Sequence, residues 1–357
     1  MKTKKWLQIY GIMQIALLIT VEATVIYIDP FFHYHKPLTS KFFYPINNER
    51  SQNDGITRNF NYDAMITGTS MTENFYTTEV DDIFGVNSIK VPYSGASYKE
   101  INDGIERAIS YNPKLKLVIR CLDMAKFLED KDYVRTDLGT YPTYLYDKKI
   151  YNDVYYIFNR DILFGKCWNI IKDGKNGNRG ITSFDEYANW MLDMKFGKEA
   201  VLKEIVEFEE PEKELHLTET EKEVLEGNIT QNVINVAEKN PQVEFYYFLS
   251  PYSVAWWGKT YQNGDIKKQI EMEKIVIEKC LNYENIHIFS YNNCTEITMC
   301  LDNYKDLTHY GEWINSKILQ SMKNGLGELT KDNYMDYLEK EYLLYSNFDY
   351  NSLINEK

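Results

Sequence analysis

The chain has few of the residues that bind metals or build a disulfide framework. Its 357 residues include only 5 Cys and 5 His. No two cysteines form a CxxC pair, and none has a histidine at zinc-binding spacing. Cys294 and Cys300 are spaced for a local bridge, but an odd total of cysteines fits buried free thiols equally well. His33 and His35 would share one face of an extended segment, without a third ligand nearby. The sequence therefore predicts no metal and no cofactor, and it leaves the redox compartment open.

The chain also lacks an excess of positive charge. Lys and Arg number 40 against 53 Asp and Glu, which gives a formal net charge of −13. Phosphate backbones are bound by clustered Lys and Arg, so nucleic acid is excluded as a partner. Thirty Tyr and six Trp would suit sugar-stacking surfaces, although a compositional bias of the genome explains the same numbers. A hydrophobic content of 44% is ordinary for a folded protein.

A single apolar run is long enough to cross a membrane. Three lysines within the first five residues precede residues 6–28, which hold no Lys, Arg or Asp and only one Glu, Glu22. As a helix rising about 1.5 Å per residue, this run would cover roughly 34 Å, enough for a bilayer core. No A-x-A cleavage pattern follows, which favours a retained anchor over a cleaved signal peptide. The lysines mark the cytoplasmic end, so we expect a single-pass protein of the cell membrane with everything after Asp29 extracellular.

Short apolar runs alternate with helical patterns after the anchor. Strands are expected at residues 64–67, 87–91, 115–122, 243–249 and 286–289. Ser97 and Glu100 form a capping box that opens a helix, and further helices are expected at about 265–281 and 311–322. An unbroken apolar run such as 115–122 is typical of a parallel strand buried on both faces. The alternation predicts an α/β fold with a doubly wound, parallel, five-stranded sheet in a flavodoxin-like three-layer arrangement. Its site should lie at the carboxyl ends of the strands.

The chain divides into four parts on this basis. They are the transmembrane anchor at 1–29, a juxtamembrane lead-in at 30–62, the α/β domain at 63–330 and a C-terminal tail at 331–357. Residues 124–240 exceed a minimal α/β unit, since their first half is aromatic and their second half is acidic and helix-favouring. We expect a large, mostly helical insertion beside the active-site edge. Either it forms a lid or acceptor platform, or it is a stabilising cap without substrate contact.

Two motifs far apart in the chain carry the residues of a serine nucleophile system. Ser70 follows the first strand in a Gly-Thr-Ser turn, and Asp306 precedes His309 by three residues after the last strand. A histidine can take the proton of a serine hydroxyl, and an aspartate can hold the imidazole in the tautomer that this requires. Each residue also has an ordinary structural alternative, an N-cap for the serine and a buried core position for the histidine. Together they predict a catalytic Ser70–His309–Asp306 triad.

At these residues the chain resembles the SGNH (GDSL-type) hydrolase superfamily. Residues 68–70 resemble its first block, with Thr in place of the name-giving Asp. Gly95 matches the glycine of the second block, and residues 306–309 resemble the final block. The resemblance covers about 62–322, apart from the insertion. It implies an oxyanion hole that includes the backbone N–H groups of Ser70 and Gly95.

The third block departs from the superfamily pattern, which places an Asn donor there. In this chain the third strand ends at Asp123, which becomes the candidate at that position, although an ionised carboxylate accepts hydrogen bonds and does not donate them. If an amide donor was lost at this point, Asp123→Asn would strengthen the oxyanion hole and raise turnover.

The layout is similar to membrane-anchored extracytoplasmic members of the superfamily, among them the D-alanyl transfer protein of teichoic-acid synthesis and the alginate O-acetylation proteins. This resemblance implies a serine-dependent acyltransferase or esterase that acts on acetyl or D-alanyl groups of a cell-envelope glycan. A membrane acyl-donor protein would be a further partner. The alternative is a non-catalytic envelope-assembly or glycan-binding protein on a degenerate SGNH scaffold, which the altered third block permits.

Overall fold

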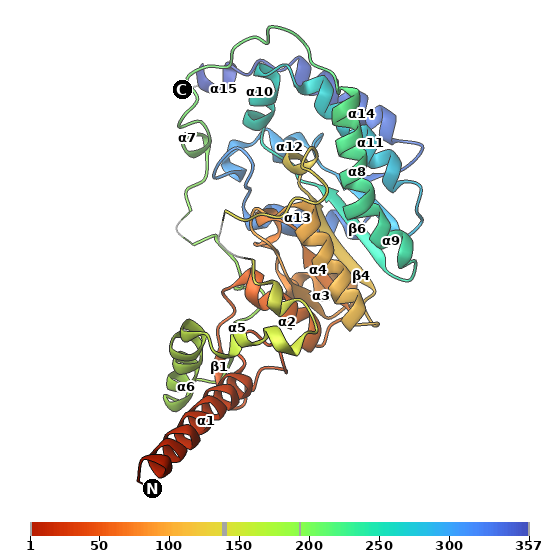
Figure 1. Cartoon of the computed structure of the whole chain (residues 1–357). Helices are drawn as coiled ribbons and strands as arrows, with labels where there is room; N and C mark the ends of the chain where they lie inside the picture. The colour runs from red at the N-terminus through yellow and green to blue at the C-terminus, as the bar shows by residue number, and fades with distance from the viewer. Residues whose placement is uncertain (1, 138–140, 193, 356–357) are drawn as a thin grey trace. The chain divides into compact units, whose positions relative to one another are not determined.

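The computed structural model describes residues 2–137, 141–192 and 194–355 (Figure 1). Its internal contacts divide the chain into two compact units. Unit 1 consists of Met1–Asn61 together with Leu138–Tyr187, and unit 2 consists of Tyr62–Asp137 together with Ala188–Lys357. The predicted boundary near residue 62 therefore separates two units, but the first of them also recruits a segment that lies far along the chain.

Unit 1 begins with helix α1 (Lys2–Ile28), in which Thr3–Ile28 is long and apolar enough to cross a membrane. Its large apolar side chains from Trp6 to Ile19 are exposed. The hydroxyls of Thr20 and Thr24 donate to the carbonyls four residues earlier, at 2.8 and 2.7 Å, so their polar groups are satisfied within the helix. The predicted helix at 6–28 with apolar side chains on its outside is therefore present.

The rest of unit 1 is built from short elements. They are α2 (Glu49–Asn59), the 3₁₀ turns η3 (Thr143–Leu145) and η4 (Ile150–Asn152), α5 (Val154–Ile157), the π-helical η5 (Asp161–Cys167), α6 (Trp168–Lys175), and the parallel pair β1 (Phe43–Tyr44) and β5 (Gly180–Ile181). The predicted lead-in at 30–62 contributes α2 and β1 to this unit.

Asp29 ties the end of α1 to the second segment of unit 1. Its carboxylate accepts hydrogen bonds from the backbone N–H groups of His33, Tyr34 and His35, at 2.7 to 3.0 Å, and from the hydroxyl of Tyr156 at 2.9 Å. Burial raises the pKa of Asp29 above its ordinary value, while these donors act in the opposite direction. The four hydrogen bonds fix the direction in which the chain leaves α1 and join that point to α5.

Unit 2 contains the main sheet. Its strands are β2 (Ala64–Thr67), β3 (Ser88–Lys90), β4 (Leu117–Leu122), β6 (Glu244–Leu249), β7 (Ile286–Ser290) and β8 (Glu328–Leu329). Their order is β3-β2-β4-β6-β7-β8, and all neighbours are parallel except β7 and β8. The prediction of a five-stranded sheet is thus corrected: the five predicted strands are present and parallel, and β8 adds an antiparallel edge.

The helices of unit 2 pack in two groups. α3 (Thr77–Phe84) packs against α13 (Glu312–Lys323), whereas α4 (Tyr98–Tyr111) packs against α9 (Asn235–Lys239), and α11 (Ile266–Cys280) against α8 (Glu219–Ile229) and α14 (Tyr334–Ser346). The remaining helical elements are η1 (Ser70–Thr72), η2 (Met124–Lys126), α7 (Lys198–Val201), η6 (Thr230–Ile234), α10 (Val254–Gln262), α12 (Thr295–Thr298), η7 (Leu301–Asn303) and α15 (Ser352–Asn355). The predicted capping box is present at the start of α4, where Ser97 and Glu100 bond each other's backbone N–H groups.

The segment predicted as one insertion, 124–240, is divided among three parts of the structure. Leu138–Tyr187 belongs to unit 1, the residues from Ala188 onward belong to unit 2, and 219–239 form the helical connection α8-η6-α9 from β4 to β6. This connection is part of the core, because the fully buried Arg120 on β4 donates to the carbonyl of Asn232 at 2.6 Å. The predicted tail also belongs to unit 2, through buried residues of α14 such as Leu338.

Candidate active site

Ser70 stands at the point where the chain leaves the carboxyl end of β2. Gly68 permits the turn, because a Cβ there would lie 2.7 Å from Cγ2 of Thr72 and 3.1 Å from Cβ of Cys121. Helix η1 begins at Ser70, but its N-cap is Thr69. The structural alternative for Ser70, a capping hydroxyl, is therefore filled by its neighbour. The Ser70 side chain is half-buried and remains available for another role.

His309 and Asp306 meet Ser70 as the motifs predict. Oγ of Ser70 lies 2.8 Å from Nε2 of His309, and Nδ1 of His309 lies 2.9 Å from Oδ2 of Asp306. Oδ1 of Asp306 accepts the backbone N–H groups of Thr308 at 2.9 Å and His309 at 2.8 Å, which closes a tight loop after η7. An ionised Asp306 can only accept hydrogen bonds, so the Nδ1 position carries the proton and Nε2 presents its lone pair to Ser70.

The electrostatics of this loop keep Asp306 ionised. Burial alone would raise its pKa, but the hydrogen bond from His309, the electrostatic interaction with that imidazole and the two backbone N–H groups lower the pKa well below its ordinary value. The side chain of Asp306 is 43% exposed and that of His309 is 25% exposed. Both side chains are therefore partly accessible to solvent.

Gly95 reaches the same edge of the sheet as Ser70. The N–H of Tyr93 donates to the carbonyl of Gly68 at 2.9 Å, so the two chains leave the sheet side by side, and Gly95 and Ser70 each follow two residues later. Gly95 has φ of +60°, and a Cβ there would lie 1.8 Å from Nη1 of Arg135. Within the described residues, neither the N–H of Ser70 nor that of Gly95 donates to a protein acceptor. Both are free to bind an oxyanion.

Asp123 does not act as a donor, which corrects its place among the oxyanion candidates. Its Oδ2 accepts the hydroxyl of Thr69 at 3.0 Å, and its Oδ1 accepts the hydroxyl of Tyr252 and the N–H of Ala125. Both carboxylate oxygens are thus occupied as acceptors. The side chain holds the residue next to Ser70 and so positions the turn; it does not contact the reacting atoms.

Two residues at the site carry no motif that the sequence could reveal. The indole of Trp190 stands edge-on to the imidazole of His309, with ring centroids 5.6 Å apart, and its Nε1–H points to the carbonyl of Ser70 at 3.4 Å. The N–H of Trp190 donates to Oδ1 of Asn74 at 3.0 Å, and Nζ of Lys305 lies 3.7 Å from the indole centroid. Nδ2 of Asn74 is buried without a partner among the described residues, so this amide is an additional unused donor one turn after Ser70.

The other sequence candidates, His33 and His35, belong to unit 1. Nε2 of His33 contacts Asp153 at 3.4 Å, and His35 contacts backbone carbonyls. The described part of the chain holds no cluster of His, Cys, Asp and Glu suited to a metal ion. The five cysteines are free, including Cys294 and Cys300.

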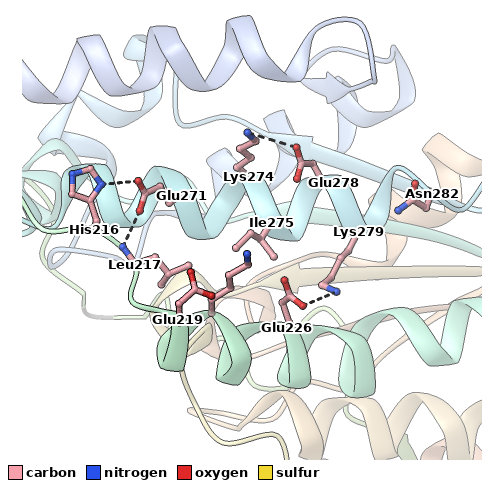
Figure 2. Close-up of a pocket in the computed structure, with 11 residues that line it drawn as sticks. His216, Leu217, Glu219, Glu226, Glu271, Lys274, Ile275, Glu278, Lys279 and Asn282 are labelled. Atoms are coloured by element: carbon pink, nitrogen blue, oxygen red, sulfur yellow. Dashed lines mark hydrogen bonds and ion pairs between the residues drawn. The ribbon is translucent and has the colours of Figure 1, made fainter.

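A separate cleft of about 580 Å³ lies between α8 and α11 (Figure 2). Its charged side chains pair with one another: Nδ1 of His216 lies 2.8 Å from Glu271, and Lys279 lies 3.7 Å from Glu226. Four glutamates and three lysines line this cleft together with His216, and the lining contains no Ser, Thr or Cys.

Comparisons with known proteins leave the family of the chain open. No protein-family model and no curated protein matches it. Among solved structures, it is similar to a protein from Streptococcus pneumonia described as a "putative platelet activating factor", with 12% sequence identity and a TM-score of 0.36. The similarity covers 81% of this chain and 90% of that chain. At this level it carries neither fold nor activity over to the present protein.

Proposed function

We propose that the protein is a serine-dependent acyltransferase or esterase of the SGNH type that acts on acyl groups of a cell-envelope glycan. The observation that carries the proposal is the continuous relay from Oγ of Ser70 through the imidazole of His309 to the carboxylate of Asp306. A histidine with only a structural role in the core would not also meet, at the end of a parallel strand, the hydroxyl of a serine that does not cap a helix.

The relay supports acyl transfer in two steps. Nε2 of His309 takes the proton of Ser70 as Oγ attacks the acyl carbonyl, and the N–H groups of Ser70 and Gly95 stabilise the oxyanion. Collapse of the tetrahedral intermediate breaks the bond to the leaving oxygen, which takes the proton from His309. A sugar hydroxyl or water then attacks the acyl-enzyme while His309 takes its proton. The second collapse returns that proton to Ser70.

The class of substrate rests on the location and on the resemblance. A chain that carries α1 as a retained anchor would meet acyl groups at the membrane surface, and the extracytoplasmic branch of the SGNH superfamily works on envelope glycans. On the side that the lysines predict, a transferase would move the acyl group from a membrane acyl-donor protein to a hydroxyl of an envelope polysaccharide, and an esterase would remove it from the acylated polysaccharide. No cofactor enters this mechanism.

A fluorophosphonate probe tests the proposal in the full-length protein. We expect labelling at Ser70 and hydrolysis of nitrophenyl acetate, both abolished in Ser70→Ala. Because Thr69 is the N-cap, Ser70→Ala should cost little stability. Thr218→Ala is the matched control: Thr218 is an N-cap hydroxyl in the capping box of α8, so its removal should cost about 1 kcal/mol of stability and leave labelling unchanged.

The second function, a non-catalytic glycan-binding or assembly protein on a degenerate scaffold, is favoured by one observation. The third-block position holds Asp123, whose oxygens are committed as acceptors. Wild-type protein that is folded, shows no labelling at Ser70 and hydrolyses no ester would decide for this alternative.

A further inference from the structure

The second segment of unit 1 exposes apolar side chains on the outside of its helices. We name as the outer stripe Ile150, Tyr151, Val154, Tyr155, Phe158, Phe164 and Trp168. Ile150 is 84% exposed, Phe164 67% and Trp168 56%. The opposite side of the same helices already supplies the core, through Tyr156, Ile162 and Ile170. The segment is therefore apolar on both sides, and the fold of unit 1 explains only one of them.

Part of the outer stripe lies on helices that pack against α1. Both α5 and η5 contact α1, and Figure 1 shows α6 beside the C-terminal part of α1. A groove of about 970 Å³ is lined by α1 from Ile19 to Ile28 and by His35, Phe42 and Ile171. Ile171 lies on α6, less than one turn after Trp168. The four hydrogen bonds of Asp29 fix this arrangement.

The length of α1 sets the depth at which these residues would lie. From Ile19 to Ile28 a helix advances about 14 Å, which is close to half of a hydrocarbon core of about 30 Å. If α1 spans the hydrocarbon core of the bilayer, the groove lies in the half of the bilayer next to the C-terminal end of α1. Residues on the adjoining surface of α6 then stand at the level of the headgroups and upper acyl chains, where Trp and Tyr are enriched.

The charge of unit 1 fits the same surface. The part of unit 1 that follows α1 holds 11 Lys and Arg and 9 Asp and Glu, so its formal net charge is +2, while unit 2 has −17. Arg160, Lys166, Lys172 and Lys175 lie among or directly after the residues of the outer stripe. Such side chains can lay their stems along an apolar surface and bring their charges to anionic headgroups.

We propose that unit 1 is a membrane-interface platform: the outer stripe is inserted in the lipid layer where α1 emerges, with the neighbouring Lys and Arg on anionic headgroups. The occupant of the exposed apolar surface is thus lipid, in the same bilayer that α1 crosses. This inference rests on the membrane location of α1 and is independent of the chemistry of Ser70.

Depth-dependent quenching in the full-length protein tests the platform. Phe164→Cys and Trp168→Cys are made in a Cys294→Ser, Cys300→Ser background, labelled with an environment-sensitive fluorophore and reconstituted in mixed phosphatidylcholine–phosphatidylglycerol vesicles. Glu186→Cys, an exposed polar position in unit 1, is the matched control, and Ile15→Cys reports insertion of α1. We expect nitroxide lipids to quench most of the emission at 164, 168 and 15, and aqueous iodide to quench that at 186.

Each other outcome overturns the proposal in a recognisable way. If iodide quenches the labels at positions 164 and 168 as strongly as the label at position 186, while nitroxide lipids quench the label at position 15, the outer stripe lies in water. Protection of 164 and 168 from both quenchers identifies a protein partner or a second copy. A label at 15 that iodide reaches means that α1 is not inserted, whatever the activity of Ser70. As a charge test, Lys166→Glu with Lys172→Glu should reduce lipid quenching at 168 only when phosphatidylglycerol is present, and an equal effect without it would remove the headgroup contact.

Discussion

Asp306→Asn is the substitution that separates a working relay from three polar residues that merely lie close together. In the structure Oδ1 of Asp306 accepts two backbone N–H groups, from Thr308 and His309, and lies 3.0 Å from Nδ1 of His309, while Oδ2 lies 2.9 Å from the same nitrogen. An asparagine can keep its oxygen on the two backbone groups, so the loop should retain its shape. Its NH₂ group then stands where Oδ2 was, opposite Nδ1.

The consequence is a change of tautomer at His309. An NH₂ donor can face Nδ1 only if that nitrogen is the acceptor, which moves the imidazole proton to Nε2. A protonated Nε2 cannot accept the proton of Ser70, 2.8 Å away. Loss of the correct tautomer in this type of triad lowers kcat by about 10⁴, which corresponds to about 5.4 kcal/mol of activation free energy. We expect KM to change little, because Asp306 contacts His309 and the backbone and would not touch the acyl group.

The assay is the rate of fluorophosphonate labelling, with nitrophenyl acetate hydrolysis beside it and thermal unfolding as the check on the fold. Asp302→Asn, at an exposed aspartate in the same loop region, is the matched control and should keep the wild-type rate. The lowered pKa of Asp306 stabilises the fold above the unfolded pKa, and this contribution disappears as pH falls through the folded value, so the variant should lose that acid dependence. A folded Asp306→Asn protein that labels within tenfold of wild type would refute the relay.

Three further changes follow from contacts in unit 2. Trp190→Ala removes the ring packed on His309 and should lower kcat by up to about tenfold, since an aromatic pair is worth about 0.5–1.5 kcal/mol; an unchanged kcat in stopped-assay kinetics would assign no positioning role to the indole. Asp123→Asn should lower both Tm and kcat, because one of the two oxygens that accept hydrogen bonds is replaced by a donor. The sequence led to the opposite expectation, and a raised kcat would support an oxyanion donor at position 123. Burial raises the pKa of Glu273 to about 7 and that of the adjacent Glu341 well above its ordinary value. The two carboxyls therefore favour the folded state in their protonated form, and the free energy of unfolding falls as pH rises through about 7. Glu341→Gln should therefore raise Tm at pH 9 and alter it little at pH 5. Thermal unfolding across this range tests this, and a change in Tm that is the same at every pH would contradict the prediction.

The strands and the triad could be predicted because both depend on local pattern. Residues 64–67 are β2 as expected, and the other four predicted strands differ from β3, β4, β6 and β7 by at most two residues at either end. Parallel strands bring their carboxyl ends to one edge, so two motifs that follow such strands were expected to meet. The Ser70–His309 hydrogen bond spans 239 residues of sequence and still follows from that rule.

The rest of the site could not be predicted, because its signals are tertiary. Trp190 and Asn74 join the site through a hydrogen bond between residues 116 positions apart, and neither belongs to a recognisable pattern. Strand β8 has two residues, too few for any alternation to register. Asp123 fits a lost donor by position in the sequence, whereas its hydroxyl partners Thr69 and Tyr252 come from two other loops.

The acidic stretch that looked like part of an insertion shows how composition can conceal a core element. Helix α8 carries Glu219, Glu221, Glu223 and Glu226 on a surface that hides its buried residues Leu225, Asn228 and Ile229. Asn228 donates to the carbonyl of Phe127 at 3.3 Å and accepts from Asn232 at 2.9 Å. A buried polar ladder of this kind has no apolar periodicity, so the connection from β4 to β6 reads as a charged surface segment.

Unit 1 poses the same difficulty on a larger scale. Its two segments are separated by 76 residues of unit 2, and the net charge of the whole chain, −13, is opposite in sign to the +2 that unit 1 carries outside α1. The net charge of the whole chain argues against binding to an anionic surface, whereas the charge of unit 1 alone argues for it. Because electrostatic attraction falls off within about 8 Å at physiological ionic strength, only the charges close to a membrane surface decide whether that surface attracts the protein. The prediction from total charge that nucleic acid is not a partner therefore reflects the excess of acid in unit 2, which the surface around α1 does not share.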